Sequence, residues 1–168
     1  MRENERHRRD RERGEEYQDF LTQYMIRNHG IPLNLYSSKK YQFEYGEGAS
    51  GIEVKFDAMS EKYGNWYIET EHKTSPEQPD WRPGGVMRND NAWLYLIGNS
   101  EQAMLMSKRQ LRLVIQHKSD EYKLTHGIKF KEIATSRGYA FPISYCKGFL
   151  CLKHFVFDKR FVFSGDNQ

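Results

Sequence analysis

Cysteines are scarce and long apolar runs are missing, and both absences narrow what this chain can be. Cys146 and Cys151 are its only cysteines, too few for a disulfide framework or for a structural zinc site, which needs four ligands. The histidines lack metal-ligand spacing, no apolar stretch is long enough to span a membrane, and the N-terminus has no signal-peptide core. We therefore expect a cytosolic protein with no membrane partner.

The composition fits one folded domain over residues 1–168. Hydrophobic residues make up 38% and aromatic residues 14% of the chain, which favours a folded, sheet-containing protein over disorder. A net charge of +3 permits a nucleic-acid partner without requiring one. No internal repeat or linker divides the chain.

Hydrophobic periodicity predicts the elements. Residues 1–13 form a charged N-terminal extension, after which Tyr17, Leu21 and Met25 lie on one stripe of a helix that ends near Gly30. Alternating or apolar segments predict strands at 41–45, 51–57, 65–73, 93–97, 102–106, 129–133, 139–143 and 149–157, a second helix at 108–118 and a disordered tail at 164–168. This order is typical of an α+β fold with one mixed sheet.

Segments 51–57 and 65–73 alternate strictly between apolar and polar residues and are separated by seven residues. We interpret them as a β-hairpin whose polar face carries acids and lysines. The two plausible registers place Glu53 opposite either Glu69 or Glu71, with the two carboxylates about 5 Å apart. Asp57 falls beside the turn, roughly 13 Å further along.

Carboxylates held this close repel one another unless a cation compensates them. Converging carboxylate oxygens are what a hard divalent cation such as Mg²⁺ requires. The alternative is an ordinary solvent-facing sheet with interleaved acids and lysines, which has no further function.

With a helix followed by strands, and with an acid preceding Glu71-His-Lys73, the chain resembles the PD-(D/E)XK nuclease superfamily. The resemblance covers about residues 14–100 and depends on Glu53, Glu71-His-Lys73 and Gly14-Glu-Glu16. More narrowly, residues 51–57 followed by Gly-Asn-Trp-Tyr-Ile-Glu look like small phage-type members, which implies the host cytoplasm if a phage encodes the chain.

The resemblance implies a restriction-endonuclease-like αβββαβ core, with a central mixed sheet flanked by helices, and a DNA endonuclease that depends on Mg²⁺ or Mn²⁺. Glu53 and Glu71 would bind the metal, Lys73 would assist the attacking water, and Glu16 matches an accessory acid of some members. Glu53 replaces the family's usual aspartate, and the additional Glu69 leaves open which acid is the second ligand. Glu53-Val-Lys55 is a rival E-x-K, which we discount because the family's lysine follows the second metal-binding acid.

Basic side chains would contact the phosphate backbone of DNA. The candidates are Arg82, Arg88, Lys108, Arg109 and Arg112. They also support a second hypothesis, a non-catalytic nucleic-acid-binding protein on the same fold. A third is a protein-interaction domain with an ordinary charged sheet face. A homodimer would suit cleavage of both strands, and the sequence leaves the oligomeric state open.

Overall fold

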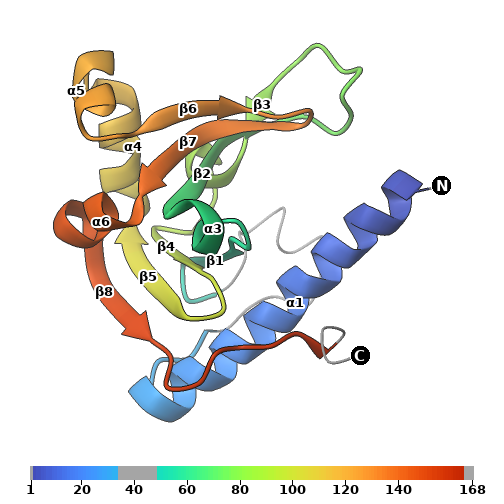
Figure 1. Cartoon of the computed structure of the whole chain (residues 1–168), viewed down its shortest axis with the longest axis vertical. Coiled ribbons are helices and arrows are strands. Elements are labelled where there is room, and N and C mark those ends of the chain that lie inside the picture. Colours follow the sequence, from blue (N-terminus) through green and yellow to red (C-terminus); the bar gives the residue numbers. More distant parts are fainter. Residues whose placement is uncertain (1, 34–48, 165–168) are drawn as a thin grey trace.

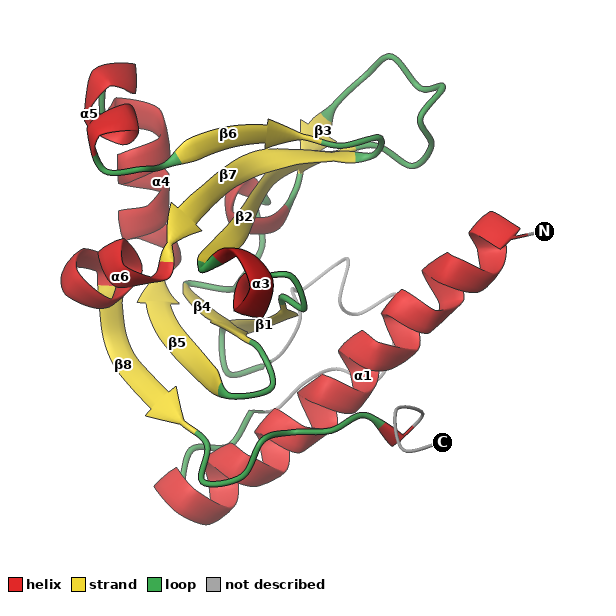
Figure 2. Ribbon diagram, in the orientation of Figure 1, coloured by secondary structure: helices red, strands yellow, loops and turns green. Residues whose placement is uncertain are grey.

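The computed structural model describes residues 2–33 and 49–164, which form an α+β protein with two four-stranded sheets (Figures 1 and 2). The elements are α1 (Arg2–His29), β1 (Ile52–Phe56), α3 (Ser60–Tyr63), β2 (Asn65–His72), β3 (Arg82–Pro83), η1 (Gly85–Met87), β4 (Leu94–Gly98), β5 (Gln102–Ser107), α4 (Lys108–His117), α5 (Asp120–Thr125), β6 (Lys129–Glu132), β7 (Ser136–Pro142), α6 (Ile143–Tyr145), η2 (Cys146–Leu150) and β8 (Cys151–Val156). The strand predicted at 41–45 and most of the predicted tail lie outside the described residues.

The first sheet has the strand order β1-β4-β5-β8. β1 runs parallel to β4, with Glu53 beside Tyr95, whereas the other two pairings are antiparallel, so this sheet is mixed. All residues of β4 are buried, as its apolar sequence predicts for a central strand. Asn99 closes the turn into β5, because its Oδ1 accepts the backbone N–H groups of Glu101 and Gln102, both at 3.0 Å.

The second sheet has the order β3-β2-β7-β6 and is antiparallel throughout. β2 buries Trp66, Ile68 and Thr70, so the predicted alternation of this strand is confirmed. The pairing with β7 shifts between Glu69 and Glu71, which marks a β-bulge.

The predicted hairpin of 51–57 and 65–73 is wrong. Both segments are strands, but β1 pairs with β4 in one sheet and β2 pairs with β3 and β7 in the other. Asp57 explains the departure, because its Oδ1 accepts the N–H groups of Met59 and Ser60, at the start of α3, at 3.0 and 3.1 Å. Its Oδ2 accepts the N–H of Tyr67 at 2.8 Å. The connection is therefore a helical turn that carries the chain from one sheet to the other.

The first sheet is the middle layer of the molecule. One of its faces packs on α1 through a core that includes Tyr17, Leu21 and Met25, which confirms the stripe predicted for that helix. The other face packs toward the second sheet and α4 through a core that includes Trp66 and Leu111. Figure 1 shows α1 on one side of the first sheet and the β6–β7 hairpin on the other.

The α+β class is thus confirmed, whereas the expectation of a single central sheet is wrong, because the described strands form two sheets. The αβββαβ core implied by the resemblance remains a prediction. Residues 2–13, the expected extension, are the first turns of α1. No helix among the described residues is long and apolar enough to cross a membrane.

Candidate functional site

Glu53 lies at the centre of a group of charged side chains on the face of the first sheet that meets the second sheet. Its side chain is 0% exposed. Lys108 Nζ donates to Glu53 Oε2 at 2.8 Å and to Asp90 Oδ1 at 3.0 Å. Lys55 Nζ lies 3.1 Å from Glu53 Oε1. One buried ammonium therefore joins two buried carboxylates.

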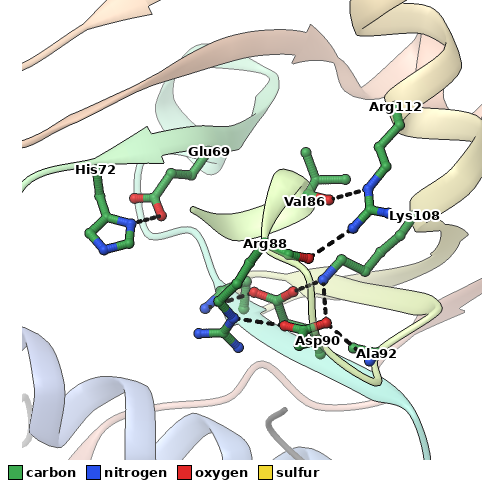
Figure 3. Close-up of polar contacts among 10 residues, drawn as sticks. Glu69, His72, Val86, Arg88, Asp90, Ala92, Lys108 and Arg112 are labelled. Atoms are coloured by element: carbon green, nitrogen blue, oxygen red, sulfur yellow. Dashed lines mark hydrogen bonds and ion pairs between the residues drawn. The ribbon is translucent and has the colours of Figure 1, made fainter. Parts of the chain in front are cut away.

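Asp90 is held from the other side as well. Arg88 Nε donates to its Oδ2 at 2.7 Å and the backbone N–H of Ala92 donates to its Oδ1 at 3.0 Å (Figure 3). We call Glu53, Lys55, Arg88, Asp90 and Lys108 the Glu53 cluster. The side chains of Lys55 and Arg88 are 36% and 25% exposed, so the cluster reaches solvent at this rim.

Three separate segments position the cluster. β1 places Glu53 and Lys55 two residues apart on one face of a strand. Lys108 is the first residue of α4, which begins there because Ser107 Oγ accepts the N–H of Gln110. Figure 3 shows how Arg112 fixes the segment before Asp90, by donating to the Val86 carbonyl at 2.6 Å and to the Arg88 carbonyl at 2.9 Å.

Glu53 remains ionised in this environment. Burial acts to raise its pKa, but the charges of Lys55 and Lys108 outweigh burial and lower the pKa to about 2. Its Oε1 faces the Lys55 ammonium at 3.1 Å, a charge-assisted contact that also lowers this pKa. A carboxylate oxygen has two lone pairs, so one ammonium on each oxygen leaves room for a further ligand.

Glu69 and Glu71 do not join this cluster. Glu69 Oε2 accepts a hydrogen bond from Ser136 Oγ at 2.8 Å, and its Oε1 lies 3.9 Å from His72 Nδ1. Glu71 instead pairs with Arg137 through two hydrogen bonds of 2.6 and 2.9 Å. The predicted opposition of Glu53 to either acid is therefore wrong, because β2 belongs to the other sheet.

Lys73 and Glu16 also have other partners. Lys73 Nζ donates to the Pro76 carbonyl at 3.0 Å and lies 4.7 Å from the centre of the Trp81 ring. Glu16 on α1 accepts hydrogen bonds from the backbone and hydroxyl of Ser164, at 2.7 and 2.6 Å. Ser164, which we expected to be disordered, is thus attached to α1. Over the described part of the chain, no three His, Cys, Asp or Glu side chains form a group that could hold a metal.

The five predicted DNA-contacting residues do not form one exposed basic surface. Arg82 and Arg109 are exposed. Lys108 is buried between carboxylates, Arg88 is paired with Asp90, and Arg112 binds backbone carbonyls. The ammonium of Lys108 is shielded from solvent in this structure, and its contact with phosphate stays a prediction.

The sequence prediction missed Asp90 and the burial of Lys108. Asp90 lies in a loop rich in Gly, Pro and Asn, where an acid is unremarkable, and Lys108 follows an N-cap, where a basic residue is usually solvated. One available signal was the E-x-K of Glu53 and Lys55, because two charges on one face of a short apolar strand need partners if that face is buried.

Comparison with family models, with curated proteins and with solved structures found no match to this chain. The Glu53 cluster itself therefore has to indicate the chemistry. It offers two buried carboxylates, a buried ammonium and two cationic side chains at a partly exposed rim, a combination suited to a phosphate ester and to a cation that binds one.

Proposed function

We propose that the chain is a divalent-metal-dependent phosphodiesterase that cleaves DNA, with Glu53 and Asp90 as the metal-binding acids. The observation that carries the proposal is the convergence of these two buried carboxylates on one cation, the Lys108 ammonium, at 2.8 and 3.0 Å. The resemblance to the PD-(D/E)XK superfamily supports it. Here the E-x-K is Glu53-Val-Lys55, whose charged ends meet, and not Glu71-His-Lys73.

The donor set fits Mg²⁺ or Mn²⁺. Magnesium in phosphate-processing sites is bound by one or two carboxylates together with waters and substrate phosphates. The lowered pKa keeps Glu53 ionised, and each of its oxygens has one ammonium partner and a lone pair left for a metal ion. When bound, such an ion would supply an activated water and compensate charge on the phosphoryl oxygens.

The cationic side chains have roles of their own in this proposal. Lys55 is the most exposed member of the cluster and lies beside Glu53, so its ammonium would stabilise negative charge on the phosphate. Arg88 is at the same rim and would orient a phosphate oxygen. Lys108 holds the two acids together and has to move aside where a metal binds between them.

A non-catalytic nucleic-acid-binding protein is the second candidate. The observation in its favour is that Lys108 already compensates the charges of both acids, so that neither acid needs a metal ion. The cluster would then only stabilise the fold. The two candidates differ in one outcome, the cleavage of DNA by the wild-type protein in the presence of metal.

A cleavage assay on supercoiled plasmid, linear duplex and single-stranded circles with Mg²⁺ or Mn²⁺ tests the proposal. Lys55→Ala is the informative variant, since its side chain is the most exposed of the cluster, and circular dichroism checks that the variant is folded. We expect it to lower the cleavage rate by about 100-fold, the usual effect of losing one group that stabilises the transition state.

Lys73→Ala is the matched control, because it removes the lysine of the rival E-x-K, and its rate should stay close to that of the wild type. A wild-type protein that cleaves no DNA form with either metal would overturn the phosphodiesterase. Loss of cleavage in Lys73→Ala but not in Lys55→Ala would mean that Glu71-His-Lys73, and not Glu53-Val-Lys55, forms the site.

A further inference from the structure

The second sheet has a hollow on the face turned away from the core. Its volume is about 640 Å³, and we call it the Tyr67 hollow. The residues that line it include Asp57, Tyr63, Tyr67, Lys129, Lys131 and Ala140. Strand register explains its form. Tyr67 on β2 lies beside Ala140 on β7, which lies beside Lys129 on β6, so the three share one face of the sheet. The small central residue leaves a floor between two taller walls.

The walls present aromatic rings to solvent. Tyr63 is 58% exposed at the end of α3. Tyr67 is half-buried and its hydroxyl is joined to Ser136 Oγ by a hydrogen bond of 2.8 Å, which fixes the position of the ring. Rings held in place at a solvent-facing groove are platforms on which nucleic-acid bases stack.

Lysines line the other side. Lys129 and Lys131 lie on one face of an extended edge strand, roughly 7 Å apart, so they can contact successive phosphates of one strand. Across residues 49–164, no ion pair engages either ammonium. Lys62 adds a third positive charge at the rim, where its Nζ lies 5.2 Å from the Tyr63 ring centre.

Among the described residues that line the hollow, Asp57 is the one carboxylate. Its oxygens accept the backbone N–H groups of Met59, Ser60 and Tyr67, and burial raises its pKa. These backbone dipoles compensate its charge from below. Glu69 lies behind the Tyr67 hydroxyl, to which Ser136 connects it, so the positive side of the hollow is the one formed by the β6 lysines. That side complements a phosphate backbone.

We propose that the Tyr67 hollow binds a single-stranded segment of nucleic acid, with bases against Tyr63 and Tyr67 and phosphates along Lys129 and Lys131. The choice of ligand rests on the proposed function, which it deepens by naming the strand form that is held. A duplex is disfavoured because its bases are stacked on one another and cannot offer their faces to the tyrosines.

Binding without metal tests this separately from cleavage. The probe is a fluorescein-labelled oligo(dT) strand, measured by fluorescence anisotropy in EDTA over a series of KCl concentrations, with a labelled duplex for comparison. The variants are Lys129→Gln/Lys131→Gln and Tyr63→Ala, and Lys153→Gln/Lys159→Gln is a control with the same charge change at exposed positions outside the hollow.

We expect the wild type to bind the single strand more tightly than the duplex. Removing the two lysines should reduce the slope of log affinity against log salt by about 1.4, or 0.7 for each phosphate contact. Tyr63→Ala should weaken binding by about 10-fold, the loss of one stacked base. The control should match the wild type.

No binding of oligo(dT), tighter binding of the duplex, or equal salt slopes in the two double variants would overturn the inference. Intact binding without cleavage would overturn the phosphodiesterase and leave the binding surface standing. Cleavage that persists in a protein unable to bind oligo(dT) would overturn the binding surface and leave the phosphodiesterase standing.

Discussion

Lys108 is buried, although its helix has the basic composition of a solvated one. Burying an ammonium costs several kcal/mol unless paired charges and hydrogen bonds compensate it. Glu53 and Asp90 supply both, and each carboxylate in turn depends on the ammonium. Breaking such an arrangement leaves unpaired charges in the interior, so its members are interdependent.

Replacing Lys108 with methionine should therefore destabilise the protein by about 3–5 kcal/mol, because two buried carboxylates lose their shared partner. Urea unfolding followed by circular dichroism measures this. Arg109→Met is the matched control at the next, exposed position of α4 and should change stability by less than about 0.5 kcal/mol. Equal unfolding midpoints for the two variants would contradict the buried pairing.

The pKa of Glu53 gives its contribution a definite pH dependence. The value falls from 4.5 to about 2 in the folded protein, so between these limits the unfolded state binds more protons. The contribution of Glu53 is fully present above pH 4.5 and is lost as the pH falls toward 2. Urea midpoints measured over this range should show a smaller acid loss in Glu53→Gln than in the wild type.

Glu101→Gln provides the reference for that measurement, because Glu101 is an exposed acid outside the cluster. The urea midpoint of this variant should fall with decreasing pH as much as that of the wild type. If the urea midpoint of Glu53→Gln falls by the same amount, Glu53 does not titrate with a lowered pKa.

At the scale of the element, local pattern predicted which residues face inward but not which strands pair. The alternation of 65–73 correctly placed Trp66 and Ile68 in the core. Pairing depends on the connection, where Asp57 accepts the N–H groups of Met59 and Ser60 at the start of α3 and that of Tyr67. β1 and β2 therefore belong to different sheets. An aspartate three residues before a serine at a strand end was the available sign of this turn.

The β-bulge in β2 depends on close approach of the backbones. A Cβ on Gly138 would lie inside 3.0 Å of the Ile68 carbonyl oxygen, with no flexible side chain that could yield. Gly138→Ala should therefore destabilise the protein by about 2 kcal/mol or more, since β2 and β7 have to separate. Thermal unfolding measures the loss.

Gly148 offers a control for that substitution. A Cβ there meets nothing within 4 Å, so Gly148→Ala should be neutral or stabilise by up to about 1 kcal/mol through a less flexible unfolded chain. A loss of stability in Gly148→Ala as large as in Gly138→Ala would mean that backbone contact at the bulge is not the cause.

At the scale of the whole molecule, the α+β class and the inward face of α1 could be predicted, because each is encoded locally. The candidate site could not, because its members come from positions 53–55, 88–90 and 108, and nothing in the neighbourhood of Lys108 shows what covers it. Glu69 and Glu71 were assigned to Glu53 by a pairing that the fold does not make.

The position of β4 in the middle layer restricts how the sequence of this strand can vary over evolutionary time. β4 is the strand through which α1 on one side and the second sheet on the other are both packed, and every one of its residues is buried. Tyr95 and Ile97 belong to one core, and Leu94 and Leu96 to the other. Drift along this strand is therefore restricted to exchanges between apolar side chains of similar volume, whereas exposed positions such as Arg109 are free to diverge.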